Sequence, residues 1–244
     1  MTKGWRPRSA MVLAAGLGTR MRPLTDALPK PLVPLKGRAL IDHVLDRIAE
    51  ADISRAVVNV HYLADKIQAH LRTRTRPEIV ISDERDALLD TGGGVVRALP
   101  LLGPEPFLIH NSDSVWIEKG TSNIARLADH WDTIRMDGLL LLARRASSLG
   151  YEGRGDFELH ADGRVSRRPR ERESDYVFTG VSIADSRLFR GAPADRFSLN
   201  EPLNSAIASG RLFGLVLEGS WMHIGTADSL ADAAKQIDLE NAAG

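Results

Sequence analysis

The sequence predicts an α/β fold, in which helices cover both faces of a doubly wound, mostly parallel β-sheet. Short apolar runs of strand length alternate along the chain with segments whose apolar residues recur at helical spacing. A glycine-rich turn follows the first apolar run, and Asp113 follows the run at residues 107–110. Since ligands of such sheets bind at the carboxyl ends of the strands, both features predict a site there. We predict one domain over residues 1–244.

Each element is predicted from its local pattern of apolar residues. The first half contains predicted strands at residues 9–15, 55–60, 78–82 and 107–110, and predicted helices at residues 39–51, 63–71 and 93–99. The pattern then changes. Residues 156–160 and 164–167 flank a turn-forming Ala-Asp-Gly, which predicts a small β-hairpin as a substrate-side extension. A strand at residues 176–183, a helix at 199–209, a strand at 212–217 and an amphipathic helix at 227–239 complete the prediction.

The bulk composition excludes several functional classes. Lysine plus arginine equals aspartate plus glutamate at 32 each, so we expect no nucleic-acid partner and no membrane partner. The chain has no cysteine, which excludes disulfides, thiolate metal sites and cysteine nucleophiles. The first apolar run is broken by Gly16 too soon for a signal peptide or a membrane span. We therefore expect a cytoplasmic protein.

A glycine-rich segment follows the first predicted strand. It reads Leu-Ala-Ala-Gly-Leu-Gly-Thr-Arg-Met-Arg-Pro-Leu-Thr at residues 13–25, and Pro-Lys-Pro-Leu-Val-Pro follows at residues 29–34. Gly16 and Gly18 would let the backbone approach a triphosphate closely, and Arg20 and Lys30 would stabilise charge on the phosphoryl group and on a pyrophosphate leaving group. A glycine pair alone is typical of a simple turn. The chain lacks both the P-loop and the Gly-x-Gly-x-x-Gly patterns, so a P-loop kinase or a dehydrogenase is disfavoured.

These two segments together resemble the signature of the sugar-1-phosphate nucleotidyltransferases. The resemblance implies a Rossmann-like nucleotide-diphospho-sugar transferase fold. It also implies that the glycine loop wraps a nucleoside triphosphate, that Arg20 contacts the phosphates and that Lys30 bridges toward them as catalytic residues. The residues assigned to the nucleotide on this basis are Leu13, Ala14, Gly16, Gly18 and Thr19.

A second glycine cluster, Asp-Thr-Gly-Gly-Gly, occupies residues 90–94 and opens a predicted helix. Unpaired N–H groups and the positive end of the helix dipole could face a ligand there. The cluster could equally be a structural helix N-terminus with Thr91 near the cap. In the family a similar Glu-Thr-Gly-Gly-Gly lies against the nucleobase and ribose. The resemblance thus implies nucleotide binding by Thr91, Gly92 and Gly93.

A third segment, Leu-Ile-His-Asn-Ser-Asp-Ser at residues 108–114, delivers one carboxylate to the end of a buried strand. Mg²⁺ uses one or two carboxylates together with phosphate oxygens and waters. Asp113 is therefore the predicted metal ligand and a catalytic residue, with Mg²⁺ as the expected cofactor and Mn²⁺ as an alternative. The family usually has Gly-Asp or Asn-Gly-Asp here, so Ser112 departs from the pattern while the carboxylate stays in place.

The largest departure from the family pattern lies at Ser-Trp-Met-His-Ile-Gly-Thr, residues 220–226. The family commonly has Trp-x-Asp-x-Gly-Thr, whose aspartate is the second magnesium ligand, whereas this chain has His223. Imidazole is a poor ligand for Mg²⁺ and suits softer ions better. His223 could bind another metal, could contact a phosphate while Asp113 alone anchors Mg²⁺, or could mark a homologue without activity. We favour the phosphate contact.

The acceptor side is predicted from two further segments. Gly-Arg-Gly-Asp-Phe at residues 153–157 and Phe-Thr-Gly-Val at residues 178–181 resemble segments that line the acceptor pocket in the muramate-phosphate uridylyltransferase branch of the family. As structure alone, they would be the start of the hairpin and a strand glycine. The arginine-rich residues 164–172 could be a solvated loop or a phosphate clamp. The resemblance assigns sugar-phosphate binding to Asn111, Gly153, Asp156 and Gly180.

The predicted reaction is an in-line attack by a sugar 1-phosphate on the α-phosphorus of a nucleoside triphosphate, with release of pyrophosphate. By resemblance, the expected substrates are UTP and N-acetylmuramate 1-phosphate, in cell-wall recycling. The alternatives are a mannose-1-phosphate guanylyltransferase, a glucose-1-phosphate thymidylyl- or uridylyltransferase, and a non-catalytic sugar-nucleotide-binding regulator. A choline-phosphate cytidylyltransferase is disfavoured because few aromatic residues lie near the motifs. We expect a monomer or a small homo-oligomer.

Overall fold

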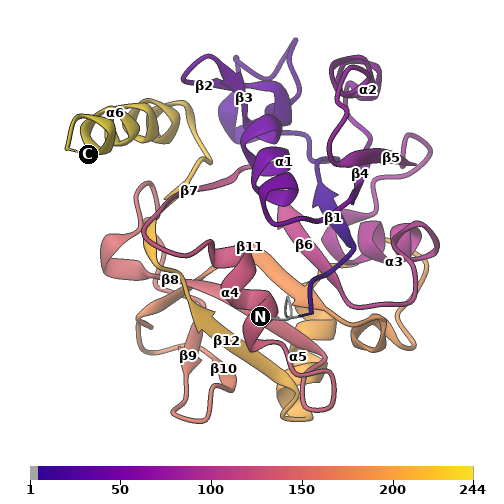
Figure 1. Cartoon of the computed structure of the whole chain (residues 1–244), viewed down its shortest axis with the longest axis vertical. Coiled ribbons are helices and arrows are strands. Elements are labelled where there is room, and N and C mark those ends of the chain that lie inside the picture. The colour runs from indigo at the N-terminus through magenta and orange to yellow at the C-terminus, as the bar shows by residue number, and fades with distance from the viewer. Residues whose placement is uncertain (1–4, 244) are drawn as a thin grey trace.

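The computed structural model describes residues 5–243 (Figure 1). Residues 1–4 and 244, the ends of the predicted domain, lie outside the described residues. A nine-stranded sheet has the order β10-β9-β11-β6-β1-β4-β5, with β8 beside β11 and β12 beside β8. Its strands are β1 (Ser9–Leu13), β4 (Arg55–Val60), β5 (Glu78–Asp83), β6 (Phe107–Asn111), β8 (Gly138–Arg144), β9 (Phe157–Leu159), β10 (Val165–Arg167), β11 (Tyr176–Ala184) and β12 (Leu212–Val216).

The sheet is mixed but mostly parallel at the end that carries the glycine loop. Strands β5, β4, β1 and β6 run parallel, and so do β8 and β12. Strand β11 is antiparallel to β6 and β8, and its register with β8 shifts between Phe178 and Ser182. Gly180 lies at this irregularity with φ of +78°, a conformation that favours glycine. The predicted fold class and the predicted hairpin, β9–β10, are confirmed.

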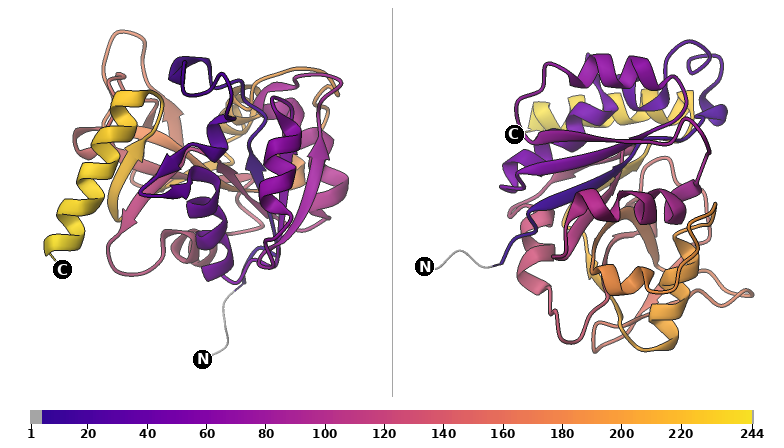
Figure 2. Two further views of the ribbon diagram at one scale, coloured as in Figure 1. Left: turned by 90° about the horizontal axis from the view of Figure 1, so that it is seen from above. Right: turned by 90° about the vertical axis from the view of Figure 1, so that its right-hand side faces the viewer.

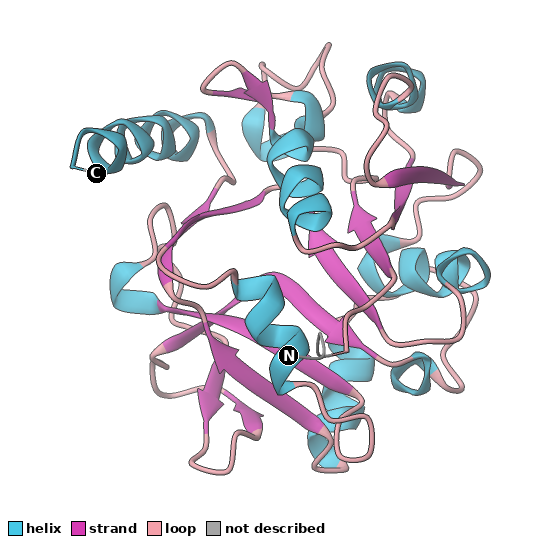
Figure 3. Cartoon of the chain, viewed as in Figure 1, coloured by secondary structure: helices cyan, strands magenta, loops and turns pink. Residues whose placement is uncertain are grey.

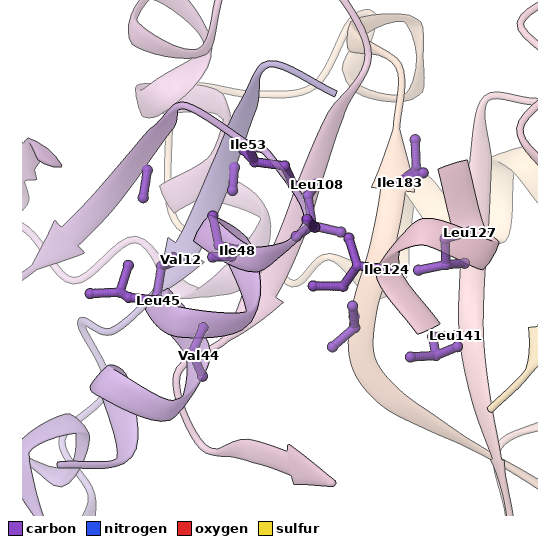
Figure 4. Close-up of a cluster of buried hydrophobic side chains, with 14 of the residues drawn as sticks. Val12, Val44, Leu45, Ile48, Ile53, Leu108, Ile124, Leu127, Leu141 and Ile183 are labelled. Carbon is purple, nitrogen blue, oxygen red and sulfur yellow. The ribbon is translucent and has the colours of Figure 1, made fainter. Parts of the chain in front are cut away.

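Helices cover both faces of the sheet, as the two views in Figure 2 show. Helices α1 (Leu40–Glu50), α2 (Ala64–Leu71) and α4 (Asn123–His130) contribute to one core, and α3 (Asp90–Leu102) and α5 (Asn200–Ala208) contribute to the other. Strand β1 serves both cores, since Ala10 and Val12 enter the first and Met11 enters the second. Figure 4 shows part of the first core, where Val12 and Leu108 of the sheet lie near Leu45 and Ile48 of α1.

A third, smaller core joins the two ends of the chain. Strand β7 (Ser114–Glu118) pairs with β13 (Gly219–His223), and β2 (Pro34–Leu35) pairs with β3 (Arg38–Ala39), in two small sheets (Figure 3). Met21 from the glycine-rich segment and Leu35 of β2 pack with Met222 and Ile224 and with Ala233 of α6 (Ala227–Ala243). This packing brings the segment around His223 to the glycine loop.

One α-helix and five strands were not among the predicted elements, namely α4, β2, β3, β7, β8 and β13. Strand β8 is almost wholly apolar and lies in the sheet between β11 and β12. Strands β7 and β13 are far apart in sequence and pair only because the third core joins the chain ends. The predicted helix at residues 93–99 begins earlier, at Asp90, and ends at Leu102.

Candidate active site

The carboxyl ends of β1, β4 and β6 open into one cavity of about 350 Å³. The motifs from three separate parts of the chain meet there. The predicted site residues that line the cavity are Leu13, Ala14, Gly16, Gly18, Thr19, Arg20, Lys30, Thr91, Asn111 and Asp113. Gly92, Gly93, Gly153, Asp156, Gly180 and His223 lie outside its lining.

The glycine loop folds back on the second half of its motif. Gly18 has φ of +65°, and a methyl group added there would lie 3.0 Å from Cβ of Lys30 and 3.2 Å from Cγ2 of Thr25. The buried Thr25 donates its hydroxyl proton to the carbonyl oxygen of Gly18 at 2.8 Å. By contrast, a methyl group at Gly16 would meet no atom within 4 Å. Gly18 is thus required by packing, whereas Gly16 keeps space open in the cavity.

Lys30 and Asp113 form an ion pair in the cavity wall, with 2.5 Å between Nζ and Oδ2. The two side chains are only 13% and 23% exposed, so water screens this pair less than it screens a surface pair. Arg20 lies close by, because a methyl group at Gly225 would be 3.4 Å from Arg20 Nη1 and 2.9 Å from His223 Nε2. Two cations, one carboxylate and one imidazole therefore gather at the glycine loop.

The ring of His223 lies beside this cluster and packs with the rings of Trp221 and Tyr151, at centroid distances of 5.7 Å and 6.4 Å. Burial lowers the pKa of His223, and the positive charges of Lys30 and Arg20 lower it further, against the opposing effect of Asp113. The imidazole is consequently neutral at pH 7, and Arg20 and Lys30 carry the positive charge of the cluster.

The donors for a metal ion are few. No group of three or more histidine, aspartate or glutamate side chains within residues 5–243 has the arrangement of a metal site. Asp113 supplies one carboxylate at the cavity wall. A hard cation that shares a site with substrate phosphates needs only one or two protein carboxylates, so this donor set fits Mg²⁺ if phosphate oxygens and waters complete the coordination.

The second glycine cluster, residues 90–94, makes hydrogen bonds that were not expected from the sequence. The N–H groups of Gly92 and Gly93 both donate to the carbonyl oxygen of Phe197, at 3.0 Å and 3.2 Å. The expectation that these groups are unpaired is wrong. A methyl group at Gly92 would lie 2.3 Å from the ring of Phe197, and one at Gly93 would lie 2.5 Å from the carbonyl oxygen of Asp195. Both glycines pack against residues 195–197, and their contact with a nucleotide stays a prediction.

Thr91 lines the cavity from the start of α3. Its hydroxyl oxygen accepts a hydrogen bond of 2.9 Å from the N–H of Leu199. Thr91 was expected near the N-terminal cap of the helix, but the helix begins one residue earlier, at Asp90. The carboxylate of Asp90 accepts a hydrogen bond of 2.6 Å from the N–H of Thr91. The first turn of α3 is therefore fastened to residues 197–199 by backbone and side-chain bonds.

A buried polar chain holds the start of the glycine loop. The side-chain oxygen of Asn59 accepts the N–H of Ala14 at 2.7 Å, and its amide nitrogen donates to Glu84 Oε1 at 2.8 Å. Asn59 is 2% exposed and Glu84 is fully buried, and burial raises the pKa of Glu84. A methyl group at Gly94 would lie 2.8 Å from the Asn59 amide, so this third glycine makes room for the chain.

Sequence reasoning missed Asn59, although a polar residue within Val-Val-Asn-Val, near the carboxyl end of a buried strand, is a usable signal. Cavity residues that it also missed are Ala15, Pro31, Leu88, Asp90, Ser112, Arg196 and Gly225. Arg196 has no local signal, because the tertiary fold alone brings residues 195–199 to the cavity.

The predicted acceptor residues adjoin the cavity from the side of β11. A methyl group at Gly180 would lie 2.3 Å from the amide nitrogen of Asn111, so this glycine lets Asn111 keep its place in the cavity wall. The Asp156 carboxylate accepts the N–H of Phe178 at 2.9 Å. A methyl group at Gly153 would lie 2.4 Å from the hydroxyl oxygen of Tyr151. Gly180 thus lies against the cavity wall, whereas Gly153 and Asp156 contact residues outside the lining, and the role of all three in binding stays a prediction.

Residues 9–240 match the family model described as "Nucleotidyl transferase". The chain belongs to the nucleotidyl transferase family. It is 47% identical over 240 residues to the N-acetylmuramate alpha-1-phosphate uridylyltransferase of Caulobacter vibrioides, covering 97% of this chain and 98% of that protein. It is 33% identical over 231 residues to the protein of the same name from Neisseria meningitidis serogroup B, covering 92% and 96%.

The fold agrees with that of a solved structure. A putative glucose-1-phosphate thymidylyltransferase from Bacillus anthracis superposes with a TM-score of 0.77 at 17% identity, over 93% of this chain and 94% of that one. As a member of the nucleotidyl transferase family, the chain is an enzyme of the EC 2.7.7 type that transfers a nucleotide to a sugar 1-phosphate. Within the described residues, no helix is long and apolar enough to span a membrane.

The arginine-rich segment of this nucleotidyl transferase is engaged with the protein itself. Arg168 donates to the carbonyl oxygens of Gly155, Pro169, Arg170 and Arg172, at 2.8–3.2 Å. Arg167 donates to Asn200 and Asn204 of α5 and lies over the ring of Phe157. These contacts favour the structural interpretation of residues 164–172 over a phosphate clamp.

Replacing Asn59 by alanine tests the buried polar chain. The change leaves the Ala14 N–H and Glu84 without their partner, so we expect the free energy of unfolding to fall by about 1–3 kcal/mol. We also expect weaker nucleotide binding, because Ala14 lies in the cavity wall. Chemical denaturation and calorimetric titration with nucleotide measure the two effects. Asn204→Ala is the control, because it removes only an exposed hydrogen bond between Arg167 and α5. It should alter the free energy of unfolding by less than about 1 kcal/mol and leave nucleotide binding unchanged. An unchanged nucleotide affinity in Asn59→Ala would contradict the positioning role.

Proposed function

We propose that this enzyme transfers UMP from UTP to N-acetylmuramate 1-phosphate and releases pyrophosphate. The observation that carries the proposal is the meeting of Arg20, Lys30 and Asp113 beside the glycine loop in one cavity. The choice of substrates rests on the 47% identity to the Caulobacter relative, which extends over 97% of this chain. We further propose that the enzyme acts in cell-wall recycling in the cytoplasm. We expect it to be a monomer or a small homo-oligomer.

In the proposed reaction a phosphate oxygen of the sugar 1-phosphate forms a bond to the α-phosphorus of UTP. The bond between that phosphorus and the oxygen bridging to the β-phosphate breaks, and pyrophosphate leaves. The nucleophile already carries negative charge, so the protein has mainly to position and neutralise anions. Arg20 and Lys30 offset charge on the phosphates, and the backbone at Gly16 leaves room for their approach.

We propose Mg²⁺ as the cofactor, with Mn²⁺ accepted in its place, held by Asp113. The ion would offset charge on the triphosphate and would help to orient it. Lys30 is paired with the carboxylate of Asp113 in the structure, with 2.5 Å between Nζ of Lys30 and Oδ2 of Asp113. Lys30 is therefore close enough to pass from Asp113 to a phosphate oxygen when substrate binds. The neutral His223 would donate a hydrogen bond to a phosphate from beside this pair.

A pyrophosphate-release screen tests the proposed specificity. ATP, CTP, GTP and UTP are each combined with N-acetylmuramate 1-phosphate, N-acetylglucosamine 1-phosphate, glucose 1-phosphate and mannose 1-phosphate, with Mg²⁺ present. We expect the highest kcat/KM for UTP with N-acetylmuramate 1-phosphate. Exclusive use of GTP with mannose 1-phosphate would sink the uridylyl proposal and would leave the family membership untouched.

The variant His223→Asp tests how the imidazole takes part. The new carboxylate would stand beside Asp113, where Mg²⁺ favours oxygen ligands, so we expect magnesium-dependent turnover to be kept or raised. His223→Asn, which keeps a hydrogen-bond donor without adding charge, is the matched control and should retain turnover within a few-fold. Initial rates over a range of Mg²⁺ concentrations measure both. A collapse of turnover in His223→Asp with an unchanged fold would instead show that the imidazole has a specific role.

A further inference from the structure

Arg196 stands out among the cavity residues that no motif explains. It lies between η4 (Ser186–Phe189) and α5, in the second half of the chain. The other residues that line the cavity, except Gly225, come from the first half. The residue is exposed. Its guanidinium makes no ion pair and no hydrogen bond with the described part of the chain, residues 5–243. The five N–H donors of this arginine are therefore available to a ligand.

The backbone that carries Arg196 is held firmly. Phe197 donates its N–H to the carbonyl oxygen of Leu89 at 3.2 Å, and its own carbonyl oxygen accepts the N–H groups of Gly92 and Gly93. Two residues farther on, Leu199 donates to the hydroxyl of Thr91. A side chain at residue 92 or 93 would push this segment away by collision with Phe197 or Asp195. The run of glycines therefore fixes where Arg196 meets the cavity.

The cavity wall near Arg196 differs chemically from the wall at the glycine loop. Because Phe197 is bonded to residues 89, 92 and 93, Arg196 enters beside the start of α3, where Leu88 and Thr91 line the cavity. The cations that suit phosphates, Arg20 and Lys30, come from the glycine loop instead. One wall is thus suited to the triphosphate, and the other offers an apolar side chain, a hydroxyl, the carboxylate of Asp90 and a planar cation.

We infer that Arg196 binds the nucleoside part of the triphosphate substrate, with its planar guanidinium against the base. Guanidinium groups stack on flat π-systems, and an exposed stacking contact of this kind does not require a fixed anion. Gly92 and Gly93 then act on the nucleotide indirectly, by positioning Arg196. The inference rests on the proposed function, because it takes the cavity to hold a nucleoside triphosphate.

Calorimetric titration separates the nucleoside from the phosphates. Wild type, Arg196→Ala, Arg196→Lys and Arg190→Ala are titrated with UTP and with inorganic triphosphate, in Mg²⁺. We expect Arg196→Ala to weaken UTP binding roughly tenfold and to leave inorganic triphosphate binding unchanged. Lysine lacks the planar group, so Arg196→Lys should recover little of the loss. Arg190, exposed on the same segment and outside the cavity lining, is the matched control, and Arg190→Ala should bind both ligands like wild type.

Two results would overturn the inference. Unchanged UTP binding in Arg196→Ala would remove Arg196 from the site. Equal weakening of UTP and inorganic triphosphate, restored by lysine, would make it a phosphate-binding residue instead. A failure of the proposed function is distinguishable from both, because wild type itself would then bind GTP, ATP or CTP in preference to UTP. In that case the titrations are repeated with the preferred nucleotide in place of UTP. The comparison with inorganic triphosphate then tests whether Arg196 binds the nucleoside part. If wild type binds none of the four nucleotides, the proposed function and this inference both fall.

Discussion

Replacing Asp113 by asparagine is expected to lower kcat about a thousandfold, which is the scale of losing a group that stabilises charge in a transition state. The amide keeps the shape of the side chain and removes the carboxylate that pairs with Lys30 and that we propose to hold Mg²⁺. Lys30→Ala should cost a similar factor, since it removes a cation that faces the phosphates. Steady-state pyrophosphate release at saturating Mg²⁺ measures both.

The surface pair Lys36 and Asp238 provides the control. Its atoms are 2.7 Å apart, but both side chains are well exposed and lie outside the cavity lining. Asp238→Asn should therefore leave kcat unchanged and should alter the free energy of unfolding by less than about 1 kcal/mol. If Asp113→Asn kept wild-type turnover, Asp113 would have no part in metal binding or catalysis, and the assignment would be withdrawn.

His110 is expected to make the protein markedly less stable in acid. Its ring is fully buried, stacks on Trp116 at 5.4 Å between centroids, and bonds through Nδ1 to the carbonyl oxygen of Asn111 at 2.8 Å. Nε2 is buried and has no partner within residues 5–243. Burial lowers the pKa of His110 to about 4, with a further lowering by Arg47 and opposing effects of the Asn111 carbonyl and of Asp113.

The unfolded chain therefore binds a proton at His110 at a higher pH than the folded chain does. Its contribution to stability is complete above pH 6.5 and is lost as the pH falls from 6.5 toward about 4. The full loss is about 3 kcal/mol, at about 1.4 kcal/mol per pH unit. Chemical denaturation at pH 7.5 and at pH 4.5 measures it. His110→Phe should remove most of this pH dependence, whereas His130→Phe, at an exposed position, should keep it. The same pH dependence in wild type and His110→Phe would contradict the buried, neutral imidazole.

Local patterns in the sequence predicted the parallel half of the sheet well. Strands β1, β4, β5 and β6 are short apolar runs, and the helices between them have one apolar face, so each could be read without the rest of the chain. The orientation of β11 could not be read in that way. A strand has the same alternation in either direction, and the antiparallel pairing of β11 with β6 depends on the path of the chain between residues 112 and 175.

The residues of the candidate site, too, could be predicted from the sequence only in part. The glycine loop and Asp113 follow buried strands directly, so the sequence predicted that they lie at the same edge of the sheet, and the family signature assigned Lys30 to the same site. Arg196 could not be predicted, because four hydrogen bonds to the start of α3 bring it to the cavity, and their partners are about 105 residues away. The paired N–H groups of Gly92 and Gly93 were missed for the same reason.

Isotope transfer tests the central claim most directly. UTP is incubated with N-acetylmuramate 1-phosphate that carries ¹⁸O in its phosphate, and the products are analysed by mass spectrometry. Attack by the sugar phosphate on the α-phosphorus of UTP predicts that all of the label appears in UDP-N-acetylmuramate and none in pyrophosphate. Absence of a UDP-sugar, or label in the released pyrophosphate, would contradict the proposed function.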